Sequence, residues 1–130
     1  MLDQDSPEEV HGRAPTIDEY QKWTISTAKY PGSGEKTAPA IVYVALGLAG
    51  EAGETLEKIK KAIRGDRNGV AGIDSAALLV RDVGLLNEMG DVLYYLSRLA
   101  AETGFTMTEV MAASVKKLED RKLHGEGDTR

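Results

Sequence analysis

The sequence predicts an all-α protein, and three observations support this fold class. Hydrophobic residues make up 42% of the 130 residues but aromatic residues only 5%, so the core must be mainly aliphatic, a composition that favours helices. Apolar residues recur at helical spacing in several long segments, and none alternates as a strand would. Segments rich in proline and glycine separate them. We therefore expect four helices in a four-helix bundle.

The first helix is expected to follow a short leader. Residues 1–15 are charged and lack periodicity, which is typical of a disordered segment. Residues 16–130 are expected to form a single helical domain. Thr16 and Glu19 have the T-x-x-E spacing of a capping box, so a helix should begin there and run over about residues 17–30.

The second helix is expected to be the longest. A loop rich in proline and glycine covers residues 31–39. Pro39 is a favoured first-turn residue, and Gly65 is a favoured residue just beyond a helix end, so the helix should lie between them. Eight residues at helical spacing are expected to form its buried face: Ile41, Val44, Ala45, Leu48, Ala52, Leu56, Ile59 and Ile63.

Two further helices should complete the chain. Residues 65–75 have loop composition, and a third helix should then run over about residues 82–103. Thr106 and Glu109 repeat the capping-box spacing and begin a fourth helix, which ends near Lys122. The buried face of the third helix should consist of Leu85, Met89, Val92, Leu93, Leu96, Leu99 and Ala100.

Composition excludes several classes of function. The chain has no cysteine, which rules out disulfides, zinc–thiolate sites and thiol nucleophiles. Its net charge of −5 argues against binding a nucleic-acid polymer. No apolar run reaches the length of a membrane span, and the N-terminal residues do not have the pattern of a signal peptide. We therefore expect a cytoplasmic protein without a membrane partner.

Two pairs of acidic residues share one spacing. Glu51 and Glu54 lie three apart on the second helix, and Glu88 and Asp91 lie three apart on the third. Because each helical residue advances about 100°, both pairs fall at similar angles from the buried face of their own helix. An approximate two-fold axis relates two antiparallel neighbours, so we expect the four carboxylates to converge beside the core.

Converging carboxylates repel one another unless cations lie between them. Oxygen ligands suit hard divalent ions, so we expect Mg²⁺, with Mn²⁺ as the alternative. A di-iron site would need histidines within the helices, whereas His11 and His124 lie in or near the tails. The competing interpretation is that these acidic residues are ordinary surface charge paired with nearby lysines.

Three glycines interrupt the second helix near its carboxylates, although glycine is unfavourable in a helix interior. Gly47 lies one turn before Glu51, so we expect it to leave space for a metal or a phosphate. Gly50 and Gly53 lie further round the helix. There the absence of a side chain favours close approach of another helix or of a second subunit.

Three segments together resemble the MazG-like, all-α nucleotide pyrophosphohydrolases. They are GLAGEAGETLEKIKK (47–61), EMGDVLYYLSRLA (88–100) and KKLEDRKLHGEGDTR (116–130). The resemblance extends over roughly residues 17–130. It implies the bundle of the all-α NTP pyrophosphatase type and hydrolysis of a nucleoside triphosphate between its α and β phosphates. The products would be NMP or dNMP and pyrophosphate, in the service of nucleotide-pool house-cleaning.

The resemblance also implies roles for individual residues. The residues that match the family's Mg²⁺ ligands are Glu51, Glu54, Glu88 and Asp91. One glutamate of the second helix would also activate the attacking water, and Glu51 is favoured over Glu54 for this role. The resemblance also implies residues that bind substrate. The alternative for the tryptophan is a place in the core, and the alternative for the cationic residues is ordinary surface charge. The residues expected to bind substrate are Gln21, Trp23, Lys61, Tyr95, Lys117 and Arg121.

Several alternatives stay open at the level of sequence. Gly50 stands where the fullest form of the family motif has a first glutamate, so one or two metals are both compatible with the pattern. Phosphoribosyl-ATP pyrophosphohydrolase is a rival activity, and a non-catalytic helical nucleotide-binding or interaction module is another. Four short helices bury little surface alone, so we expect a homodimer or homotetramer to complete the bundle.

Overall fold

The computed structural model describes residues 13–123 and 125, and each regular element in this part of the chain is helical. The leader predicted for residues 1–15 therefore lies largely outside the described residues, as do both histidines. No helix in the described ranges is long and apolar enough to cross a membrane. The cytoplasmic location stays a prediction.

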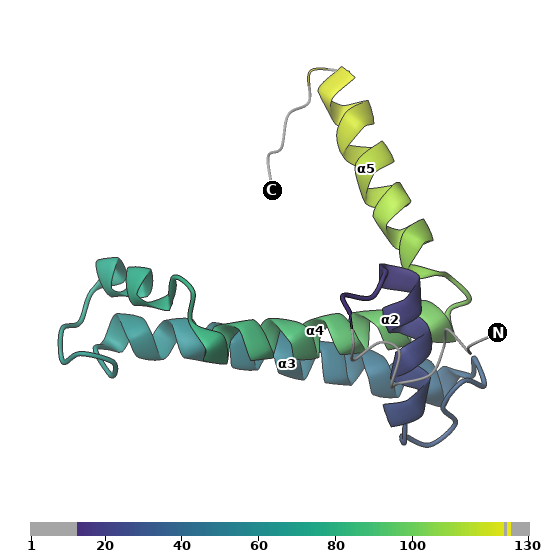
Figure 1. Cartoon of the computed structure of the whole chain (residues 1–130), viewed down its shortest axis with the longest axis horizontal. Helices are drawn as coiled ribbons and strands as arrows, with labels where there is room; N and C mark the ends of the chain where they lie inside the picture. Colours follow the sequence, from purple (N-terminus) through teal and green to yellow (C-terminus); the bar gives the residue numbers. More distant parts are fainter. Residues whose placement is uncertain (1–12, 124, 126–130) are drawn as a thin grey trace.

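Two long helices, α3 (Ala38–Arg64) and α4 (Val83–Glu102), lie side by side and antiparallel (Figure 1). Their ends follow from capping. Gly65 ends α3 in the left-handed conformation, with a φ of 94°. The Asp82 side chain begins α4 by accepting a hydrogen bond of 2.9 Å from the Leu85 backbone N–H. The predicted bounds of both helices are confirmed to within two residues.

The first helix is shorter than predicted. The capping box is confirmed, but α2 (Ile17–Trp23) ends after two turns, and the chain continues as the 3₁₀ helix η1 (Thr24–Thr27). Thr24, Ser26 and Thr27 each donate their side-chain hydroxyl to the carbonyl oxygen three residues earlier. Such local bonds compete with propagation of the α-helix. A second 3₁₀ helix, η2 (Ile73–Leu79), lies within the α3–α4 connection and was not predicted.

The last helix, α5 (Met107–Leu123), extends away from the α3–α4 hairpin (Figure 1). Its start is fastened to α2, because the Thr108 backbone N–H and hydroxyl donate to the two carboxylate oxygens of Asp18 at 2.9 and 2.8 Å. Beyond its first turns, nearly all its residues are exposed. A single chain therefore does not close the predicted four-helix bundle.

The core lies where the beginning of α3 meets the end of α4. Tyr30, Ala40 and Val44 are buried there. Three predicted core positions are wrong for the single chain: Ala45 is exposed, and Leu56 is 65% and Met89 49% exposed. The reason is geometric: α5 points away and leaves this part of the hairpin uncovered (Figure 1). The partly buried residues that pack against the core are Ala28, Tyr95 and Leu99.

A buried polar network ties the loop before α3 to the end of α4. Glu102 accepts hydrogen bonds from the Tyr30 hydroxyl and from the backbone N–H groups of Gly34 and Lys36, the last two at 2.7 and 3.0 Å. The Arg98 guanidinium lies 3.7 Å from the same carboxylate and donates to the Tyr30 hydroxyl at 3.1 Å. Because every partner is itself bonded, this network fixes the loop without leaving a buried charge unpaired.

Candidate metal centre

Three carboxylates meet where α3 and α4 face each other. Glu51 and Glu54 of α3 and Glu88 of α4 each offer an oxygen, and these oxygens lie within 4.8 Å of one another. The i, i+3 spacing places the two α3 residues on neighbouring parts of one helix face. The antiparallel hairpin then brings Glu88 opposite them, so the predicted convergence holds for three of the four carboxylates.

Two of these carboxylates have oxygens with unmet bonding capacity. Glu51 Oε2 and Glu88 Oε2 are buried and have no hydrogen-bond partner among the described residues. An unpaired buried carboxylate oxygen is costly. Oxygen ligands about 2.1 Å from a Mg²⁺ ion stand at most about 4.2 Å apart, so a small inward movement of the side chains creates a cation site. The donor set therefore fits a hard divalent metal.

The electrostatics of the cluster agree with this geometry. Burial raises the pKa of Glu51, and the negative charges of Glu54, Asp91 and Glu88 raise it further. A positive ion between the carboxylates would remove that repulsion. A cation bound between the carboxylates would therefore stabilise the ionised form of Glu51.

Asp91 lies at the edge of the cluster. It does not belong to the group of three whose oxygens lie within 4.8 Å of one another, and its side chain is exposed. Its charge nevertheless contributes to the raised pKa of Glu51. Asp91 is therefore near the centre, and its role as a ligand stays a prediction.

The space expected beside Gly47 is filled. A Cβ atom at this position would lie 2.6 Å from Tyr95 Cζ and closer still to two other atoms of the ring. The prediction that Gly47 leaves room for a metal or phosphate is wrong, because the α4 tyrosine occupies that room. Gly50 and Gly53, by contrast, would have nothing within 4 Å of an added Cβ, so no part of the described chain approaches them closely.

The predicted substrate residues on α2 have different surroundings. The Gln21 amide donates to the Phe105 and Ser97 carbonyl oxygens at 2.9 and 3.3 Å and accepts from the Met107 N–H at 3.1 Å. It acts as a bridge between helices. Trp23 lies beside Tyr20, with ring centroids 6.1 Å apart.

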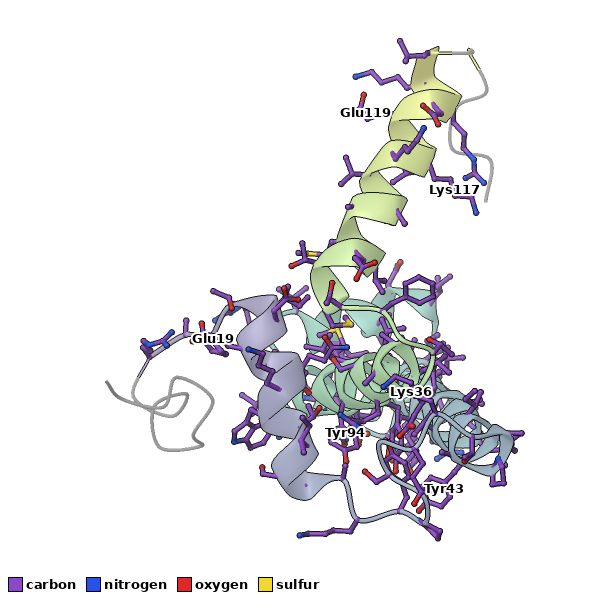
Figure 2. All side chains as sticks on the ribbon, turned by 90° about the vertical axis from the view of Figure 1, so that its right-hand side faces the viewer. Glu19, Lys36, Tyr43, Tyr94, Lys117 and Glu119 are labelled. Atoms are coloured by element: carbon purple, nitrogen blue, oxygen red, sulfur yellow. The ribbon has the colours of Figure 1, made fainter. Side chains whose placement is uncertain are left out.

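Lys61, Lys117 and Arg121 are not brought together within one chain. Lys61 is exposed in the last turn of α3. Lys117 lies on the projecting α5, well separated from the hairpin (Figure 2), and Arg121 is one turn further along the same helix. Their predicted contact with substrate phosphates would therefore require a second chain or a movement of α5.

Tyr20 is a candidate that the sequence reasoning missed. Burial raises the pKa of its phenol, and the charges of Tyr94 and Asp91 raise it further. Its i, i+3 relation to Trp23 places both rings on one face of α2. That spacing was visible in the sequence and could have identified the pair.

Comparison with known proteins agrees with the fold and the cluster. Residues 43–125 match the sequence model of the MazG nucleotide pyrophosphohydrolase domain. This match covers both carboxylate pairs and most of the described chain. The chain therefore belongs to the MazG family, a family of nucleotide pyrophosphohydrolases.

A curated relative is similar to this chain over most of its length. The chain is 37% identical over 119 residues to the Gene 37 protein of Mycobacterium phage L5, and the alignment covers 88% of this chain and 98% of that protein. That protein's name states no activity. No solved structure matches this chain significantly.

Proposed function

We propose that this chain is a Mg²⁺-dependent nucleoside triphosphate pyrophosphohydrolase. It cleaves between the α and β phosphates and releases NMP or dNMP and pyrophosphate, as in nucleotide-pool house-cleaning. One observation carries the proposal: Glu51, Glu54 and Glu88 present oxygens within 4.8 Å of one another from two facing helices. Membership of the MazG family supports the reaction class.

These three residues, with Asp91, would hold Mg²⁺ or, as the alternative, Mn²⁺. When bound, such an ion neutralises phosphate charge and lowers the pKa of a coordinated water. Glu51 and Glu88 each have one buried oxygen, whereas Glu54 and Asp91 are exposed.

Glu51 is the proposed general base. Its Oε2 has no competing hydrogen-bond partner among the described residues, so this oxygen is available to accept a proton from water. In the reaction, a water oxygen bonds to phosphorus, the bridging P–O bond breaks, and the water proton passes to the Glu51 carboxylate. Glu54 lies beside Glu51 and is proposed to hold the metal with it. Substitution of Glu54 should therefore abolish turnover.

Base and phosphate recognition are assigned to residues around the cluster. Trp23 with Tyr20 offers an aromatic face near Asp91 on which a base can stack. Lys61 is the proposed phosphate contact on α3. The Gln21 amide is committed to bonds between helices, so we do not assign it to the substrate.

We also propose that the protein works as a homodimer or homotetramer. Leu46 is 69% and Leu56 65% exposed, and with Val42, Ala49 and Gly53 they follow one stripe along α3. The projecting α5 exposes Met111, Val115 and Leu118. Mutual burial of two such faces would favour association. A single-chain mass by light scattering at micromolar concentration would contradict this part.

In such an assembly, Lys117 and Arg121 of one copy would bind substrate phosphates held at the carboxylates of another. Mixing tests this directly. Arg121→Ala and Glu54→Gln proteins should each be inactive alone, and after exchange of subunits the mixture should recover activity. If the mixture stays as inactive as its components, Arg121 does not act across subunits.

The test of the reaction is a hydrolysis panel over NTPs, dNTPs and phosphoribosyl-ATP with Mg²⁺, with pyrophosphate and phosphate measured separately. Glu54→Gln is the disabling variant. Glu57→Gln is its matched control, because Glu57 lies on the same helix but pairs with Lys60 at 2.8 Å, outside the cluster. Pyrophosphate release by the wild type and the control, but not by Glu54→Gln, is the expected result.

Other outcomes of the panel would change the assignment. Turnover of phosphoribosyl-ATP without turnover of free nucleotides would identify the rival pyrophosphohydrolase. Absence of turnover together with absence of stabilisation by Mg²⁺ would favour a non-catalytic helical module, because a ligand raises stability only by binding the native state.

A further inference from the structure

Tyr95 and Gly47 form a contact unlike that of any other helical glycine in the described ranges. The Tyr95 ring of α4 lies against the α3 backbone where a side chain at position 47 would stand. An added Cβ would come within 2.6 Å of Tyr95 Cζ, closer than real Cβ atoms approach. Gly50 and Gly90 would meet nothing within 4 Å. Because Gly47 has no side chain, it leaves a notch in the surface of α3, and the Tyr95 ring fills this notch.

The notch lies directly beside the carboxylate cluster on both helices. Gly47 is one turn before Glu51, and Tyr95 is one turn after Asp91, so each shares a helix face with a carboxylate. Burial raises the pKa of Tyr95, and the charges of Glu51 and Asp91 are among the further causes. The ring thus fills the space between α3 and α4 at one end of the cluster.

We propose that Tyr95, seated on Gly47, is a positioning residue for the metal centre. The ring sets the distance between the two backbones at this point and closes one side of Glu51 to water. Glu51 Oε2, buried and without a partner among the described residues, is thereby kept aimed at Glu54 and Glu88. Packing of the ring carries this role, and the hydroxyl is dispensable for it.

The experiment combines Mn²⁺ affinity, measured by calorimetry on the purified full chain, with thermal unfolding in the absence of metal. The variants are Gly47→Ala, Tyr95→Ala, Tyr95→Phe and the double variant Gly47→Ala/Tyr95→Ala. Gly50→Ala is the matched control, since it adds the same methyl group to the same helix in open space. This proposal rests on the proposed function, which supplies both the metal centre and the choice of metal.

Gly47→Ala and Tyr95→Ala should each weaken Mn²⁺ binding about 10- to 100-fold, the usual effect of losing a residue that orients metal ligands. Tyr95→Phe keeps the ring and should bind as the wild type does, as should Gly50→Ala. The sign of the stability change is the sharpest readout. Gly47→Ala should lower the unfolding midpoint in the wild type but raise it in Tyr95→Ala, where the ring is gone and alanine is the better helix former.

Several results would overturn the proposal. One is a Mn²⁺ affinity of Gly47→Ala within twofold of the wild type. Another is a loss of Mn²⁺ affinity in Tyr95→Phe as large as that in Tyr95→Ala. A third is that Gly47→Ala lowers the unfolding midpoint equally in the wild type and in Tyr95→Ala. If Gly47→Ala does not fold, a folded double variant supports the proposal and an unfolded one refutes it. Wild type that binds no Mn²⁺ would instead refute the proposed metal centre, and the stability comparison would still judge the ring contact.

Discussion

Two parts of the α3–α4 hairpin, its core end and its middle, bury carboxylates in opposite ways. At the core end, Glu102 is 1% exposed and accepts bonds from Tyr30 and two backbone N–H groups. Nearer the middle, Glu51 and Glu88 each bury an oxygen without any partner among the described residues. Burial alone raises a carboxyl pKa at both places. The bonds to Glu102 nevertheless bring its pKa below the ordinary value, whereas the neighbours of Glu51 raise its pKa further.

This is the difference expected between an acid that stabilises the fold and the acids of the proposed metal centre. A buried acid that serves the fold is surrounded by donors, because an unpaired one would destabilise it. A buried acid that binds a ligand has carboxylate oxygens without hydrogen-bond partners in the ligand-free protein. These unpaired oxygens lower the stability of the fold until the ligand binds. The hairpin is therefore stabilised by paired groups at its core end, whereas near its middle it keeps the unpaired carboxylate oxygens of the proposed metal centre.

The largest expected effect is at the structural end. Glu102→Ala should destabilise the protein by about 3–5 kcal/mol, because it leaves the buried Arg98 charge and several donors without their acceptor. Urea unfolding measures this. Glu119→Ala is the control, since Glu119 is exposed on the projecting α5 (Figure 2) and should change stability by less than about 0.5 kcal/mol. A loss below about 1 kcal/mol for Glu102→Ala would break the comparison.

The ligand-binding end should respond in the opposite sense. Without metal, Glu51→Gln should be as stable as the wild type or more so, because it removes a charge from a cluster of like charges. With Mg²⁺ at 100 times its dissociation constant, the wild type should gain about 2.7 kcal/mol, and Glu51→Gln should lose most of that gain. Thermal unfolding with Mg²⁺ or with EDTA provides the measurement. Strong destabilisation of Glu51→Gln in EDTA would make Glu51 a structural acid instead.

The pH dependence of stability should trace to Glu102. Its folded-state pKa is lowered from the ordinary value of 4.5 by the bonds from Tyr30, Gly34 and Lys36, which outweigh the effect of burial. Its contribution is therefore fully present above pH 4.5 and is lost as pH falls through the lower, folded-state pKa. Glu102→Gln should flatten this acid limb, as measured by urea unfolding from pH 7 to pH 3. An unchanged limb would assign acid sensitivity to other carboxylates.

The smallest expected effect concerns the stripe on α3. In a single chain, Gly53 has open space around it, so Gly53→Ala should stabilise the helix by about 0.5–1 kcal/mol. Unfolding at low protein concentration measures this intrinsic gain. If stability instead falls, and falls more at high concentration, another copy approaches Gly53 closely in the assembly.

Much of the hairpin could be predicted because local signals determine it. Thr16, Asp82 and Gly65 all lie at helix ends where their side-chain or backbone preferences place them. The carboxylate convergence also followed from spacing alone, since a regular helix fixes the direction of each side chain. These features depend on residues a few positions apart, which sequence displays directly.

Features that depend on distant contacts could not be predicted. The ring that fills the Gly47 notch comes from Tyr95, and the donors around Glu102 come from a loop about 70 residues earlier in the chain. The exposure of Leu56 and Met89 depends on the direction in which α5 leaves the hairpin (Figure 1). Helical periodicity marks an apolar face but does not identify what covers it.

Because α5 projects from the hairpin, its folding should depend on association with another copy of the protein. An isolated helix of this length is marginal in water, since most helical stability comes from packing, and among its described residues α5 buries only Met107. Its helicity should therefore rise and fall with association, so that folding of α5 becomes a concentration-dependent step. Amide hydrogens of α5 should exchange rapidly in dilute protein and slowly in concentrated protein, while those of the hairpin core stay protected throughout.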